Sequence, residues 1–175
     1  MYPQLIVYVL AACVVLLGTG SAIADDEHRN HNASLKGTYR IFTTLNNVGS
    51  TAILKSLGVI TYDGKGHAQM SDSGTIIDSN SGAAISFEET GKFTYKVNRD
   101  GSFTQEGTFT SHPIGEPGGY VITGVKWVGQ IGGRGSILMI SGTIPPEPQI
   151  FTSEGRVPSV RFGVMTGTAV RMDKE

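Results

Sequence analysis

The sequence predicts an all-β fold, a single antiparallel barrel of about eight strands over residues 36–172, built from up-and-down hairpins. Three observations lead to this prediction. Glycine is abundant, at 24 of 175 residues; β-branched and aromatic residues stand in short runs between Gly, Asp, Asn and Ser; and apolar side chains recur at every second position. A β-sandwich is the alternative, because it also protects the edges of a many-stranded sheet.

The first strand begins at Gly37. Tyr39, Ile41 and Leu45 share one face, and mostly polar residues stand between them. This period of two is typical of a half-buried strand.

Two glycine-containing turns set the register of the following hairpins. A three-residue loop at 63–66, with glycine in the left-handed conformation, places Tyr62 opposite Ala68 and Ile60 opposite Met70. All four apolar side chains then lie on one face of the hairpin.

The same device recurs at Asn98-Arg99-Asp100-Gly101, where a three-residue loop pairs Val97 with Phe103. We expect shorter strands at 74–77 and 84–88 between the two hairpins, separated by a turn-rich segment.

The last third of the barrel follows a Pro- and Gly-rich loop at 112–119. Prolines 145, 146 and 148 exclude a central strand and predict a surface loop. The remaining expected strands are 120–123, 125–128, 136–141, 151–152 and 160–171.

Residues 1–24 have the pattern of a signal peptide. An uncharged apolar run from Leu5 to Leu17 is too short to span a bilayer as a helix, and it leads into Ala22-Ile23-Ala24 and then acidic residues. We expect cleavage after Ala24 and a secreted or periplasmic protein. Residues 25–35 are then a disordered polar tail ahead of the barrel domain.

Cys13 offers a different outcome. Leu10-Ala11-Ala12-Cys13 matches the lipobox of bacterial lipoproteins, and cleavage there would leave a protein anchored through acylated Cys13. An uncleaved N-terminal anchor is a third outcome. Cys13 is the only cysteine, so a chain cut after Ala24 has no disulfide, which is common in bacterial envelope proteins.

Composition argues against several classes of partner and chemistry. Acidic and basic residues nearly cancel, at 15 and 14, and they are interspersed, so we expect no nucleic-acid partner. After residue 24 the chain also contains no apolar stretch long enough for a transmembrane helix.

The sequence nominates no catalytic residue, metal ligand or cofactor. No nucleophile, base and orienting carboxylate can be assigned, and the Cys and His spacing of a metal site is absent. Glu88 and Glu89 are adjacent on a strand and point to opposite faces, so they cannot flank one substrate. We therefore favour a role without catalysis.

Two segments resemble known barrel families. Gly37-Thr38-Tyr39 at the start of the first strand, with Arg171 at the end of the last, resembles the signature of calycin barrels such as lipocalins, although these carry tryptophan at the position of Tyr39. Residues 122–136 are similar to the glycine-rich segment of dirigent and allene oxide cyclase barrels. The resemblances imply an eight-stranded barrel with room for a small apolar ligand, and structural roles for Gly37 and Arg171.

These observations predict an exported barrel that binds a small hydrophobic molecule in its lumen. Two alternatives stay open: a structural or adhesive envelope protein without a ligand, and a cofactor-independent cyclase or isomerase. The candidate lumen residues are Tyr39, Ile41, Tyr62, Phe93, Tyr95, Phe103 and Trp127. In a small barrel the same side chains can simply fill the interior.

Overall fold

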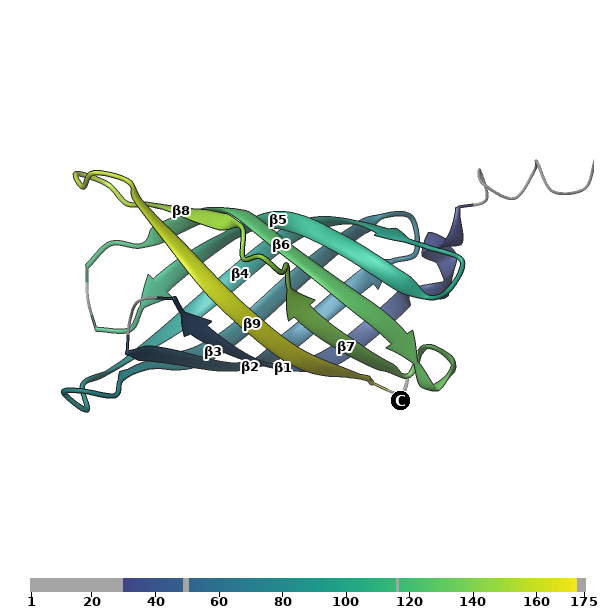
Figure 1. The fold of residues 1–175 in the computed structure, drawn as a ribbon, viewed down its shortest axis with the longest axis horizontal. Helices are drawn as coiled ribbons and strands as arrows, with labels where there is room; N and C mark the ends of the chain where they lie inside the picture. Colours follow the sequence, from purple (N-terminus) through teal and green to yellow (C-terminus); the bar gives the residue numbers. More distant parts are fainter. Residues whose placement is uncertain (1–29, 49–50, 116, 173–175) are drawn as a thin grey trace, which may run out of the picture. The chain divides into compact units, whose positions relative to one another are not determined.

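A computed structural model describes residues 30–48, 51–115 and 117–172. The barrel belongs to the compact unit His31–Glu175, and the expected signal peptide, with Cys13 and Ala24, lies outside the described residues. Figure 1 shows the strands wound around one axis. The elements are η1 (His31–Ser34), β1 (Lys36–Asn47), β2 (Ala52–Asp63), β3 (His67–Asp78), β4 (Ala84–Val97), β5 (Ser102–Pro113), β6 (Tyr120–Gly132), η2 (Gly133–Gly135), β7 (Ile137–Gly142), β8 (Pro148–Thr152) and β9 (Ser159–Arg171).

Strand pairing closes the sheet. Each strand from β1 to β6 pairs antiparallel with the next, β7 pairs with β9, and β9 pairs with β1. These are eight strands, and β8 is an extra short strand between β6 and β9, beside the short β7. The predicted up-and-down antiparallel barrel is therefore confirmed, and the sandwich alternative is wrong.

The predicted hairpin registers are confirmed. Tyr62 lies opposite Ala68 and Ile60 opposite Met70. Val97 likewise lies opposite Phe103. The left-handed glycines are present in both turns, at Gly64 with φ 78° and at Gly101 with φ 79°.

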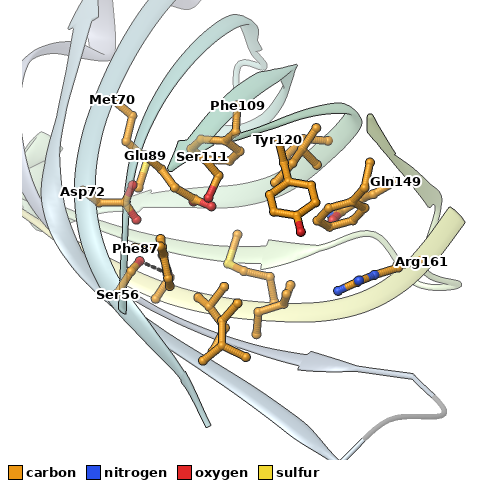
Figure 2. Close-up of a pocket in the computed structure, with 18 of the residues that line it drawn as sticks. Ser56, Met70, Asp72, Phe87, Glu89, Phe109, Ser111, Tyr120, Gln149 and Arg161 are labelled. Atoms are coloured by element: carbon orange, nitrogen blue, oxygen red, sulfur yellow. Dashed lines mark hydrogen bonds between the residues drawn. The ribbon is translucent and has the colours of Figure 1, made fainter. Parts of the chain in front are cut away.

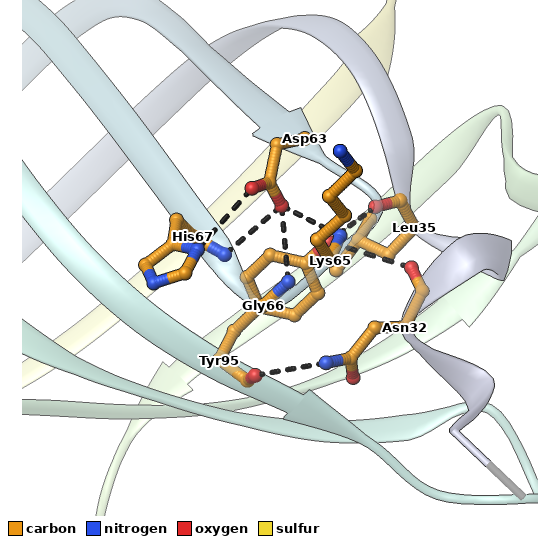
Figure 3. A network of polar contacts seen from close by, with 7 residues as sticks. All are labelled: Asn32, Leu35, Asp63, Lys65, Gly66, His67 and Tyr95. Carbon is orange, nitrogen blue, oxygen red and sulfur yellow. Dashed lines mark hydrogen bonds and ion pairs between the residues drawn. The ribbon is translucent and has the colours of Figure 1, made fainter.

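Asp63 stabilises the first of these turns. Its Oδ1 accepts the backbone N–H groups of Lys65, Gly66 and His67 at 2.6 to 3.0 Å (Figure 3). A carboxylate that accepts several amide hydrogens is favoured in its ionised form, and the pKa of Asp63 falls to about 2.

Three strands run unbroken where the sequence pattern predicts two pieces each. β3 and β4 each run without a break through a polar stretch where we expected two separate pieces, around Ser71–Ser73 in β3 and Glu88–Thr90 in β4. β6 continues through Gly124, whose φ is 73°, and the β5–β6 register shifts there, between Gly107 and Phe109. Gly124 therefore marks a bulge and not a turn.

The end of the predicted polar tail is ordered, which corrects its boundary at residue 35. His31–Ser34 form η1, Asn32 is buried, and Leu35 is 0% exposed. The Asn32 side chain accepts the N–H of Val97 at 2.8 Å. The Tyr95 hydroxyl donates to the Leu35 carbonyl at 2.8 Å (Figure 3). These bonds tie η1 to β4 and cover this end of the barrel.

The half of the barrel next to η1, here called the packed half, is filled with aromatic side chains. Tyr62 stands edge-on to both Tyr39 and Tyr95, with ring centroids 5.7 and 5.1 Å away, and Phe103 lies 6.4 Å from it. Each buried tyrosine hydroxyl has an acceptor within 2.8 Å: the Gly135 carbonyl for Tyr39, the Gln105 side chain for Tyr62 and the Leu35 carbonyl for Tyr95.

Arg171 and Gly37 meet at this end. Arg171 lies opposite Tyr39 in the β1–β9 register. A Cβ built on Gly37 would stand 3.2 Å from the Arg171 guanidinium, and Gly37 has φ 127°. The guanidinium thus lies over Gly37. Any other residue at this position would have a strained backbone, and its Cβ would crowd the guanidinium.

Candidate functional site

The other half of the barrel, here called the open half, contains an interior cavity of about 270 Å³. Inward-facing residues of every strand except β7 line it. Ile85 and Arg161, two of the lining residues, are exposed, so the cavity reaches solvent at the end of the barrel away from η1.

The inner end and walls of the cavity are apolar. Trp127, Phe109 and Met70 are the lining residues nearest the packed half along their strands. Trp127 and Phe109 stack at a tilt, with centroids 5.7 Å apart. A molecule entering from the open end would therefore meet aromatic surface at the bottom.

Above this surface, polar side chains form a belt around the interior. Asp72, Glu89, Ser111 and Tyr120 stand directly opposite one another across four successive strands, β3 to β6. Next to Asp72, on the β2 side of β3, the belt continues with Ser56 of β2 and Thr43 of β1, which share a hydrogen bond of 2.7 Å. Figure 2 shows Asp72, Glu89 and Ser111 with their oxygens gathered in the cavity.

Asp72 is the most buried acid of the belt, with 7% of its surface exposed. Burial raises its pKa to about 6, and a hydrogen bond from Ser56 opposes part of that rise. Its Oδ1 has no hydrogen-bond partner in the described part of the chain. Gly58, opposite Asp72 on β2, leaves room for this side chain, since a Cβ there would lie 2.3 Å from the Asp72 Cβ.

Glu89 faces the same cavity from the neighbouring strand. Burial and, to a smaller extent, the charge of Asp72 raise the pKa of Glu89 to about 7, against a hydrogen bond with Ser111 that lowers it. The pair therefore retains part of its protons near neutral pH. Glu88, its neighbour, is exposed, so the expectation that the two glutamates face opposite ways is confirmed.

Basic side chains stand near the open end. The Arg161 guanidinium lies 4.8 Å from the centre of the Phe151 ring, and Arg156 donates to the Tyr120 hydroxyl at 3.1 Å. In Figure 2, Arg161 stands across the cavity from Asp72 and Glu89. The cavity is acidic midway along its wall and basic near its opening.

No family model matches the chain, and no curated protein matches it. Among solved structures the chain is similar to a redesigned β barrel, mFAP1, bound to DFHBI, with a TM-score of 0.40 and 17% identity over 82% of this chain and 100% of the other. It is also similar to the S-type phycobiliprotein lyase CPES from Guillardia theta, with a TM-score of 0.36 and 12% identity over 82% and 92%. The barrel assignment rests on the strand pairing of the chain itself.

All seven predicted lumen residues are buried inside the barrel, but they divide between its halves. Trp127 lines the cavity. The other six fill the interior beside and below it: Tyr39, Ile41, Tyr62, Phe93, Tyr95 and Phe103.

Sequence reasoning missed Asp72, Glu89, Ser56 and Ser111. A usable signal exists in β3, where Asp72 continues the inward alternation of Ala68 and Met70. A carboxylate at an inward position of a strand, between apolar neighbours on the same face, indicates a polar group inside the barrel.

The described residues contain no group of three or more His, Cys, Asp or Glu arranged to hold a metal ion. They also include no helix of the length and apolar character needed to cross a membrane.

Proposed function

We propose that the protein binds one small, largely apolar molecule in the open half of its barrel. The observation that supports this most is the interior cavity of about 270 Å³, with apolar walls, aromatic surface at its inner end and a few polar groups in fixed positions. Small-molecule sites in proteins have this composition. The volume suits a compact ligand of up to three rings or a short alkyl chain.

The contrast with the packed half supports the same proposal. There, tyrosine and phenylalanine rings fill the interior, and the tyrosine hydroxyls have protein acceptors. In the open half, space is left around a buried carboxylate oxygen, Asp72 Oδ1, that lacks a partner among the described residues. His31 Nε2 and Gln105 Nε2 also lack one, but neither residue lines this cavity. A ligand would supply both the missing packing and the missing polar contact.

We also propose that the protein acts outside the cytoplasm. The apolar run 5–17 followed by Ala22-Ile23-Ala24 supports this. The intact mass of the protein from its own host tests it: a chain beginning at Asp25 is expected, an acylated chain beginning at Cys13 would indicate a lipoprotein, and a chain still beginning at Met1 would contradict cleavage.

Trp127 is a built-in reporter for ligand binding, since it is the only tryptophan of the chain and it lines the cavity. We expect the neutral probe N-phenyl-1-naphthylamine to quench Trp127 fluorescence saturably. Ile122 lines the cavity, so the larger side chain of Ile122→Phe would take up part of its volume. This variant is expected to weaken probe binding by about tenfold or more.

Val121→Phe is the matched control, because Val121 is the neighbouring residue and points outward, with 43% of its surface exposed. It is expected to leave probe binding unchanged. An absence of saturable quenching in the wild type, or equal effects of the two variants, would contradict the proposed function and favour a structural role without a ligand.

One observation favours proton-transfer chemistry, the cyclase or isomerase alternative, as a second candidate function. Asp72 and Glu89 have pKa values of about 6 and 7 in an apolar cavity, close to the range in which a carboxyl exchanges protons efficiently at neutral pH. The proton-abstraction probe 5-nitrobenzisoxazole tests this. Turnover by the wild type that is lost in Asp72→Asn/Glu89→Gln supports it, and equal rates contradict it.

A further inference from the structure

We propose that the ligand carries a protonated primary amine, which pairs with Asp72 and Glu89 while its apolar body occupies the cavity. This inference rests on the proposed function, because it assigns the ligand class of the same cavity. The structure supports it through the placement of the two carboxyls, their lack of a cationic partner and the chemistry of the groups around them.

The two carboxyls are neighbours across adjacent strands. Asp72 of β3 lies directly opposite Glu89 of β4, a pairing that brings side chains on one face within about 5.5 Å at their Cβ atoms. Both project into the cavity, and Figure 2 shows their carboxyl groups side by side. One cationic group can therefore contact both.

Among the described residues, the ion pairs with a basic side chain do not include Asp72 or Glu89. The titratable or charged groups that line the same cavity are Tyr120 of β6 and Arg161 of β9, and Arg161 stands on the far side against Phe151. β1, β2 and β5 contribute only uncharged groups to the belt. The two acids are thus held together without a protein cation between them.

Two carboxylates in an apolar cavity repel each other and lose hydration, so a bound cation would compensate for both effects. An anionic ligand head would add to the repulsion. A neutral hydroxyl could accept a hydrogen bond from a protonated acid or donate one to a carboxylate, but it would leave the charge uncompensated.

The surroundings favour a primary amine over a quaternary one. The neighbouring polar groups are the Ser56 and Ser111 hydroxyls, which already hydrogen-bond to Asp72 and Glu89 respectively. Asp72 Oδ1 is left as a free acceptor within the described chain. An ammonium group has three N–H donors for these oxygens, whereas a trimethylammonium group has none.

Protonation links ligand binding to pH. Burial raises the pKa of Asp72 to about 6 and, together with the charge of Asp72, that of Glu89 to about 7. An ammonium group favours the ionised acids, so its binding releases protons from the pair near pH 6.5 and strengthens as the pH rises from 5 to 8. A neutral ligand has no such requirement.

The test compares hexylamine, hexanol and hexanoate, which share one alkyl chain. Each is titrated against wild-type protein carrying N-phenyl-1-naphthylamine, and displacement is followed through Trp127. At pH 8 hexylamine is expected to displace the probe at a concentration about tenfold lower than hexanol, with hexanoate the weakest. Hexyltrimethylammonium is expected to fall below hexylamine.

The variant Asp72→Asn/Glu89→Gln keeps the shape of the belt and removes its charge. It is expected to lose the preference for hexylamine over hexanol when both are titrated against the same variant. Calorimetry of hexylamine binding to the wild type, in two buffers of different ionisation enthalpy at pH 6.5, is expected to show proton release. That measurement does not depend on any variant folding.

The outcomes separate the two proposals. Probe binding with equal displacement by hexylamine and hexanol would overturn the amine assignment and leave the binding function standing, as would an amine preference that survives in Asp72→Asn/Glu89→Gln. An absence of both probe binding and calorimetric hexylamine binding would overturn both. Anionic preference, with hexanoate the strongest, would assign recognition to Arg161 instead.

Discussion

The two halves of the barrel use the same strands for different purposes. In the packed half, the inward positions carry tyrosine and phenylalanine, and Tyr62 alone meets three aromatic rings. In the open half, the inward positions of the same strands carry Asp72, Glu89 and Ser111 around a cavity. Within β3, β4 and β5, the inward side chains change from apolar to polar over one or two inward positions.

This difference shows how one small barrel can be both stable and hollow. Burial and aromatic packing in the packed half supply much of the stability. The open half can then hold ionisable groups in an apolar setting, which costs stability and provides binding chemistry. We therefore expect substitutions in the packed half to lower mainly the free energy of unfolding. Substitutions of cavity-lining residues should change mainly ligand binding.

The largest difference is expected from the same substitution in each half. Tyr62→Ala removes a fully buried ring with three aromatic neighbours and a hydrogen bond, so it should lower the free energy of unfolding by about 3 to 5 kcal/mol. Tyr120→Ala, on the half-buried wall of the cavity, should cost about 1 kcal/mol or less. Urea unfolding measures both, and equal costs would contradict the division of roles.

Gly58→Ala tests whether the Asp72 side chain needs a residue without a Cβ opposite it on β2. The new Cβ would lie 2.3 Å from both the Asp72 Cβ and the Ser71 carbonyl oxygen, so β3 must shift. We expect a loss of about 2 to 3 kcal/mol in urea unfolding, together with weaker ligand binding. Gly132→Ala is the control, because its Cβ would stand 3.8 Å from its nearest neighbour. A similar loss of stability in Gly132→Ala would show that the loss in Gly58→Ala does not come from the contact with Asp72.

The acidic pair should make the protein less stable at high pH. Each carboxyl has a folded pKa, about 6 for Asp72 and about 7 for Glu89, above its unfolded value. The folded chain therefore binds more protons than the unfolded chain between about pH 4 and pH 7, and stability falls as pH rises through that window. Asp63 has a lowered pKa, about 2, so its contribution to the pH dependence of stability falls below pH 4, outside this window.

From pH 5 to pH 8 we expect the free energy of unfolding to fall by about 2 kcal/mol, allowing for solvent screening of Glu89. Asp72→Asn/Glu89→Gln should flatten this dependence and be more stable than the wild type at pH 8. Thermal unfolding at a series of pH values measures it. An unchanged pH dependence in the variant would show that other groups cause the effect.

The smallest effect on stability is expected in η1, which covers the end of the packed half. Asn32→Ala removes the acceptor of the Val97 N–H, a buried hydrogen bond of 2.8 Å, at a cost of about 1 kcal/mol. Probe binding in the open half should not change, because Asn32 stands at the opposite end of the barrel. A loss of binding together with stability would mean that the two halves are coupled.

Much of the fold could be predicted from local chemistry. Turns with a left-handed glycine fixed the registers at Tyr62 and Val97, and alternation placed Tyr39 and Trp127 inside. These signals are short-range, so they survive without knowledge of the rest of the chain. Eight strands without an exposed edge then left the barrel as a preferred solution.

The cavity could not be predicted in the same way. Whether an inward side chain fills space or borders it depends on which side chains face it across the barrel, and this is a long-range property. The sequence pattern predicts a separate short strand at 74–77, which leaves the polar stretch around Asp72 outside any expected strand. In the barrel it is a strand whose inward carboxyl faces a cavity and whose outward residues face solvent.

Gly124 and Leu35 show the same limit in two other places. Gly124 was expected to end a strand, yet pairing of β6 with β5 on both sides of it makes it a bulge. Leu35 was assigned to a polar tail by the composition of its neighbours, and it is buried because Asn32 and Tyr95 secure η1 against β4. In each case a tertiary contact outweighs the local signal.

The most direct test of the central claim is native mass spectrometry of the protein purified from its own host. The claim is that the open half holds a small molecule. We expect a complex heavier than the denatured chain by one small ligand, and we expect that added mass to be lost in Ile122→Phe and retained in Val121→Phe. A bare mass, together with no response of Trp127 to N-phenyl-1-naphthylamine, would contradict it.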